Sequence, residues 1–138
     1  MSDWFSEDER ATIRTLADVL IPAAEGMPCA SSIGCADAAL DDVLTLRAEL
    51  APKMRAALQL AQGKAPKAAL DDMRSADPEN WQAFTLAIAA AYYFSPRVRA
   101  LLGYSGPERR PVDPTEPLGC ADVLAPVIAR GPIGRLAP

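Results

Sequence analysis

The sequence predicts an all-α fold, a small irregular bundle of about five helices followed by an extended, proline-rich C-terminal arm. Apolar residues recur at steps of three and four through most of the first hundred positions, which is the spacing of one helix face. No stretch shows the alternation or the enrichment in β-branched residues that strands need. Seven of the 13 prolines lie between Pro107 and Pro138, and because proline lacks an N–H it suits neither a helix interior nor a central strand.

The N-terminal half begins with a clear helix signal. Residues Ser6 to Glu9 form a capping box, so we expect a first helix from there to Ile21, where Pro22 stops it. Residues 22–34 are rich in proline, glycine and small side chains, which predicts an irregular loop of about a dozen residues. Asp37 is expected to open a second helix that extends to Leu50, with a buried side made of Leu40, Val43, Leu44 and Leu46. A third helix is predicted from Pro52 to Gly63 and a short fourth from Lys67 to Ser75.

The stretch from Trp81 to Pro107 is predicted to be the centre of the fold. Asp77 and Pro78 mark a helix start, because the carboxylate can accept free N–H groups and proline suits the first helical position. One apolar stripe and one small-residue side suggest a helix packed on more than one side; the stripe is Trp81, Phe84, Ile88 and Tyr92, and the small side is Ala83, Ala87, Ala90 and Ala91. Ser95-Pro96 repeats the start signal for a short basic helix to Leu102, which Gly103 ends.

The sequence as a whole suggests two domains of different character. We expect a helical domain over residues 1–106 and an arm over residues 107–138, with one helical piece near Ala121 to Ala129. The arm could be a disordered end or could pack on the body or on a partner. Its apolar content favours packing; the residues concerned are Val112, Leu118, Val123, Leu124, Val127 and Ile128.

Composition excludes several classes of function. A net charge of −4, from 14 basic and 18 acidic residues, argues against a nucleic-acid-binding surface. No apolar run approaches the roughly 20 residues that span a bilayer, so no membrane insertion is expected. The chain has no histidine, which removes the commonest general base and the commonest metal ligand. We identify no catalytic, cofactor-binding or metal-binding residue, and the neighbouring carboxylates Asp41-Asp42 and Asp71-Asp72 point about 100° apart on a helix.

The three cysteines match no familiar metal pattern, since Cys29 and Cys35 lie in the loop and Cys120 lies far along the arm. We expect small or half-buried thiols. A Cys29–Cys35 disulfide, or a bridge from Cys120 to a partner, is the alternative and would require an oxidising compartment.

Both ends of the chain resemble a known family. A helix ending in LADVLIP precedes a small-residue loop, and much later the chain has AYYFSPRVRALLGYSGPERRPVDP. Together they are similar to the third, small subunit of gluconate 2-dehydrogenase and its relatives; the middle of the chain matches poorly. The resemblance implies a non-catalytic subunit of a heterodimer, which helps a large FAD-dependent flavoprotein of the glucose-methanol-choline type to fold, mature or travel. That partner would carry the FAD and oxidise an alcohol group of a sugar or polyol.

Tyrosine and arginine often anchor protein interfaces. We therefore predict that a partner contacts the end of the central stretch, through Tyr93, Arg97, Arg99, Tyr104, Arg109 and Arg110. The opposing interpretation is that the tyrosines belong to the core and the arginines are merely solvated. Relatives commonly begin with a twin-arginine export signal that is not seen here, so the expected location is the cytoplasm, or the periplasm if the chain is exported with a partner.

Two other functions are compatible with the same helical fold. The chain could be a free-standing adaptor or regulator that holds varied partners, which predicts a soluble monomer. It could also be an enzyme that uses Asp, Glu or Tyr as acid and base, but nothing in the sequence places two such groups together.

Overall fold

The computed structural model of the 138-residue chain describes residues 4–108 and 121–131. Within these residues the protein is all-α, as predicted, and its only β-type pairing is an isolated bridge between Ala24 and Met27. The chain divides into two units, residues 1–105 and residues 106–138. The helices are α1 (Glu7–Leu20), the 3₁₀-helix η1 (Ser31–Ile33), α2 (Ala38–Leu46), α3 (Leu50–Ala61), α4 (Pro66–Ala76), α5 (Pro78–Phe94), α6 (Pro96–Leu101) and α7 (Ala121–Arg130).

Most helix starts agree with the sequence signals. The capping box of α1 is present, because the Glu9 N–H donates to Ser6 Oγ (3.2 Å) and the Ser6 N–H donates to Glu9 Oε2 (2.8 Å). Asp77 caps α5 by accepting from the Asn80 N–H (3.1 Å). Ser95 differs from the prediction, since its side chain makes no capping hydrogen bond to α6. Proline at the first helical position, where no N–H partner is required, is sufficient there.

The prediction of one helix from Asp37 to Leu50 was wrong. Helix α2 ends at Leu46, and α3 begins at Leu50, two residues before Pro52. A proline ring clashes with the helical carbonyl four residues earlier, so a continuous helix through Pro52 would be blocked at Ala48. The break leaves Leu46 in the last turn of α2 with 71% of its surface exposed, although we predicted that it would be buried.

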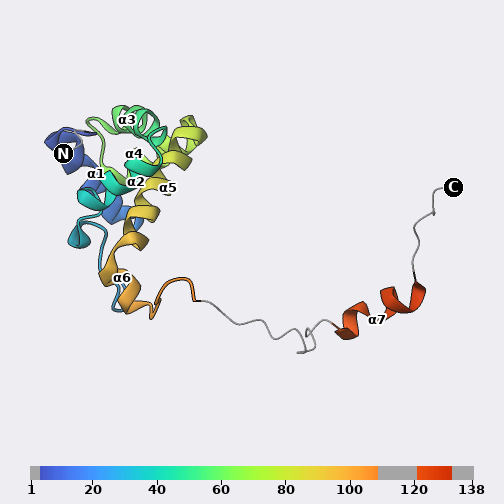
Figure 1. Cartoon of the computed structure of the whole chain (residues 1–138). Coiled ribbons are helices and arrows are strands. Elements are labelled where there is room, and N and C mark those ends of the chain that lie inside the picture. Colours follow the sequence, from blue (N-terminus) through green and yellow to red (C-terminus); the bar gives the residue numbers. More distant parts are fainter. Residues whose placement is uncertain (1–3, 109–120, 132–138) are drawn as a thin grey trace. The chain divides into compact units, whose positions relative to one another are not determined.

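Helix α5 is the centre of the bundle. It packs against α2, α3, α4 and α6, and Figure 1 shows it passing through the body with α6 continuing from its end. Both of its predicted packing sides are largely buried; the buried residues are Ala83, Phe84, Ala87, Ile88, Ala91 and Tyr92, while Trp81 and Ala90 are half-buried. The prediction of a central helix packed on more than one side is confirmed.

The long loop between α1 and α2 is fastened to both α1 and α5. Asp18 of α1 accepts from the Ser31 N–H (2.8 Å) and hydroxyl (2.6 Å), at the start of η1. The Tyr92 hydroxyl donates to the Pro28 carbonyl (2.8 Å), and the Cys35 thiol donates to the Ile88 carbonyl (3.3 Å). The bonds to the Ser31 N–H and the Pro28 carbonyl satisfy backbone groups of the loop, so the predicted irregular loop is an ordered part of the bundle.

The second unit contains one described helix. We expected a helical piece near Ala121 to Ala129, and α7 confirms it, with Pro126 inside the helix. Its four large apolar side chains are all exposed; they are Val123, Leu124, Val127 and Ile128. The other two apolar residues predicted for the arm, Val112 and Leu118, lie outside the described residues.

Candidate partner-binding surface

The predicted contact residues that the structure describes gather at the end of α5 and on α6. Tyr93 is in the last turn of α5 and Tyr104 follows α6, with 56% and 54% of their surfaces exposed. Arg97 and Arg99 are exposed on α6. Arg109 and Arg110 lie outside the described residues. The interpretation that places the tyrosines in the core holds for Tyr92, which is buried, but not for Tyr93 or Tyr104.

Backbone hydrogen bonds hold this region in a tight shape. The Arg99 N–H donates to the Ser95 carbonyl (3.1 Å), and the Tyr104 N–H donates back to the Arg99 carbonyl (2.9 Å). Gly103 between them has φ +65°, which a side chain would disfavour. The Arg99 guanidinium also donates to the Phe94 carbonyl (3.2 Å), at the end of α5. Fully buried Val98 fixes α6 to the core, so the exposed side chains project from a rigid support.

Several apolar residues that we did not predict as contacts belong to the same surface. We define the α5–α6 corner as the exposed residues Tyr93, Phe94, Arg97, Arg99, Leu101, Leu102 and Tyr104. Phe94 has 44% of its surface exposed, and Leu101 and Leu102 are about half exposed. The signal for Phe94 was present in the sequence, because Leu86, Ala90 and Phe94 recur at steps of four and form a further apolar stripe on α5.

An apolar groove continues from the corner along α5. We define the α2–α5 groove as a depression of about 200 Å³ lined by Val43, Leu46, Arg47, Leu50, Leu86, Ala90 and Phe94. Leu46 and Leu86 are exposed at its edges. Phe94 belongs to both the groove and the corner, so the two surfaces meet at this residue. Arg47, the only charged residue of the groove, forms an ion pair with Glu49.

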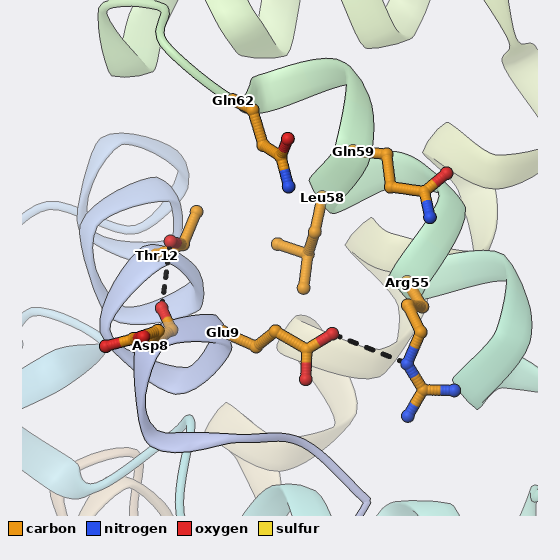
Figure 2. Close-up of a pocket in the computed structure, with 7 residues that line it drawn as sticks. All are labelled: Asp8, Glu9, Thr12, Arg55, Leu58, Gln59 and Gln62. Carbon is orange, nitrogen blue, oxygen red and sulfur yellow. Dashed lines mark hydrogen bonds and ion pairs between the residues drawn. The ribbon is translucent and has the colours of Figure 1, made fainter.

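A second depression, of about 200 Å³, lies between α1 and α3 and is lined mostly by residues with polar or charged ends. Figure 2 shows Glu9 of α1 extending towards Arg55 of α3, while Thr12 bonds to Asp8 within α1. The Glu9 carboxylate takes part in the capping box and forms an ion pair with Arg55 (Oε1–Nε 3.4 Å). The hydrogen bond that it accepts from the Ser6 backbone N–H lowers its pKa. Arg55 also donates to the Trp4 carbonyl and lies over the Phe5 ring at 5.5 Å. These contacts fasten the N-terminal residues to α3, which is a structural role.

The two described cysteines are free thiols in different surroundings. Burial raises the pKa of Cys35 to about 12. Hydrogen bonding with Ser31 lowers the pKa of half-buried Cys29, whose Sγ lies 3.6 Å from Ser31 Oγ. The Cys29–Cys35 disulfide that we considered is therefore absent, whereas Cys120 lies outside the described residues.

Metal-binding groups and membrane-spanning helices are both absent from the residues that the structure describes. No group of three or more Cys, Asp or Glu side chains is placed to hold a metal ion there. None of the helices in residues 4–108 and 121–131 is both long enough and apolar enough to cross a membrane. Comparisons of the chain with protein-family models, with curated proteins and with solved structures found no match.

Proposed function

We propose that this chain is the non-catalytic small subunit of a heteromeric, FAD-dependent dehydrogenase of the glucose-methanol-choline type, which oxidises a sugar or related alcohol. In this proposal the chain binds the large flavoprotein through the α5–α6 corner and supports its folding, maturation or stability. The FAD belongs to the flavoprotein. The proposal draws on the resemblance of residues 92–107 to the small subunit of gluconate 2-dehydrogenase and on the character of the surface that these residues form.

The observation that carries the proposal is the uncovered side of α5. From Ala83 to Phe94 the only polar side-chain groups are the hydroxyls of Thr85, Tyr92 and Tyr93, so the helix is apolar around its circumference. Such a helix is ordinarily buried on all sides. Here Leu86, Tyr93 and Phe94 are exposed, which suits a helix whose remaining side is covered by another protein.

The size of the exposed surface supports an interface. A tyrosine or phenylalanine buries roughly 200 Å² when fully enclosed, so the three half-exposed aromatic residues Tyr93, Phe94 and Tyr104 present about 300 Å². Exposed leucines in the corner and groove add to this area. Contiguous apolar patches of this size on soluble proteins commonly mark binding sites. Aromatic residues flanked by arginines are also the composition typical of interface anchors.

The proposed location is the cytoplasm, or the periplasm if the chain is exported with the flavoprotein.

Co-purification tests the proposal directly. The chain, with a tag at its N-terminus, is expressed with the large flavoprotein encoded nearest to it, and the flavin absorbance of the eluted protein is recorded. We expect a yellow complex, and loss of dehydrogenase activity when the small chain is omitted. A Tyr93→Ala, Tyr104→Ala double variant should release the flavoprotein, whereas Val19→Ala, which truncates an exposed apolar residue of α1, should retain it.

The opposite result would favour the adaptor function. A colourless, well-folded monomer, together with a flavoprotein that is fully active alone, would overturn the accessory-subunit proposal. Circular dichroism of each variant shows whether a loss of binding reflects a lost contact or a lost fold.

A further inference from the structure

The charges near the α5–α6 corner differ in sign from those of the chain as a whole. The chain has a net charge of −4, yet residues 80–107 contain two arginines and no aspartate or glutamate, and the next acidic residue is Glu108. The carboxylate that precedes this stretch is Glu79, in the first turn of α5, and it is paired with Lys53. A 17-residue helix is about 25 Å long, so this pair lies well away from the corner.

The two arginines of α6 are not neutralised within the described residues. Neither Arg97 nor Arg99 forms an ion pair with another described residue. The hydrogen bond from Arg99 to the Phe94 carbonyl orients the guanidinium but leaves its charge uncompensated. The charge of Arg99 therefore lies close to Phe94, which lines the apolar α2–α5 groove, and Arg97 is exposed two residues earlier on α6.

We propose that the partner surface bound here is an amphipathic protein segment with carboxylates beside its apolar residues. An apolar side chain of the partner fills the α2–α5 groove, between Leu46, Leu86 and Phe94, while aspartate or glutamate residues pair with Arg97 and Arg99. This inference rests on the proposed function and specifies the chemistry of the flavoprotein's contact surface.

The physical roles of the two parts differ. Burial of apolar area in the groove supplies affinity, because Phe94 and the leucines leave water when they are covered. Charges at the rim of an interface mainly speed association and reject partners of the wrong sign. Since exposed charges are screened by salt, the preference for an acidic partner should weaken as the ionic strength rises, whereas the apolar contribution should persist.

A pair of matched peptides tests the preference. Two synthetic helical peptides carry the same leucine and phenylalanine positions, and their flanking positions are glutamate in one and lysine in the other. Binding to the full chain is measured by fluorescence anisotropy. We expect the glutamate peptide to bind at least ~10-fold more tightly at about 0.05 M salt, and this ratio to shrink towards one at about 1 M, where the screening length is ~3 Å.

Charge reversal identifies the groups responsible. The Arg97→Glu, Arg99→Glu double variant should reverse the preference between the peptides. The matched control is Lys67→Glu with Arg74→Glu, which makes the same change in net charge on exposed positions of α4 and should leave the preference unchanged. Leu86→Asp, which places a charge at the groove, should weaken the binding of both peptides.

Two outcomes would overturn the inference: equal affinity for the two peptides, or no binding of either peptide. In the second case, binding to phosphatidylserine vesicles that the Arg97/Arg99 reversal abolishes would identify an anionic lipid surface as the ligand instead. The same reversal tested on the flavoprotein complex separates this inference from the proposed function. If the complex forms and is indifferent to the reversal, the small-subunit function stands and the acidic-partner inference fails.

Discussion

Two sides of α5 carry similar side chains, but one side is buried and the other is exposed. Phe84, Ile88 and Tyr92 are enclosed by neighbouring helices, whereas Leu86, Tyr93 and Phe94 face solvent. Both sets are aliphatic and aromatic, and both recur at helical spacing. The comparison shows that the first set holds the fold together, while the second is free to contribute to binding. Stability measurements should separate the two sets, and the other comparisons below likewise set two similar residues in different surroundings against each other.

The largest difference is expected between two phenylalanines of α5. Phe84→Ala removes a fully buried ring and leaves a cavity, so the free energy of unfolding should fall by about 3–5 kcal/mol. Phe94→Ala removes a half-exposed ring and should cost about 1 kcal/mol or less in the isolated chain. Urea unfolding followed by circular dichroism measures both. Equal losses would show that Phe94 is part of the core and would weaken its assignment to the binding surface.

The next contrast is expected between the alkylation rates of the thiols of Cys29 and Cys35. In a Cys120→Ser background, iodoacetamide at neutral pH should label Cys29 at least ~10-fold faster than Cys35, because the thiolate is the reactive form and access is required. Burial against α5 raises the pKa of Cys35, and hydrogen bonding with Ser31 lowers that of Cys29. Mass spectrometry of digested samples follows each site. Comparable rates for the two thiols would mean that the loop opens readily from α5.

The caps of the two successive helices offer a smaller contrast. Asp77→Ala removes a carboxylate that accepts from the Asn80 N–H and from the Asn80 side chain (2.7 Å), and should destabilise the chain by about 1 kcal/mol. Ser95→Ala should have the smaller effect, because the serine, although buried, makes no capping bond. Thermal unfolding compares the two variants. A larger effect at Ser95 would contradict the conclusion that Pro96, without a Ser95 cap, is sufficient to start α6.

A contrast of similar size involves one hydroxyl in each of two adjacent tyrosines. Tyr92→Phe removes the hydrogen bond to the Pro28 carbonyl and should cost about 1 kcal/mol. Tyr93→Phe removes a solvent-facing hydroxyl and should have no measurable effect on unfolding. The two rings pack edge to face with their centroids 5.5 Å apart, and both substitutions keep that contact. An equal loss in the two variants would indicate that Tyr93 is also bonded within the fold.

Local signals predicted most of the helix boundaries. The capping box at Ser6, the Asp77-Pro78 start and Gly103 after α6 act through groups only a few residues apart, and such short-range chemistry is visible in a sequence. Asp37 shows the limit of this reasoning. It occupies the position before α2, but its carboxylate pairs with Arg14 of α1 (2.6 Å) and makes no capping bond. A partner 23 residues away cannot be inferred from local spacing.

The sequence alone determined that this protein is helical, that α5 is its centre and that aromatic and basic residues cluster at the end of that helix. Periodicity specifies which residues share a side of a helix, because it depends only on the geometry of the helix itself. Only the tertiary structure decided which sides are covered. It buried Tyr92, exposed Tyr93, Phe94 and Leu46, and opened the α2–α5 groove, since burial depends on where neighbouring helices end and pack.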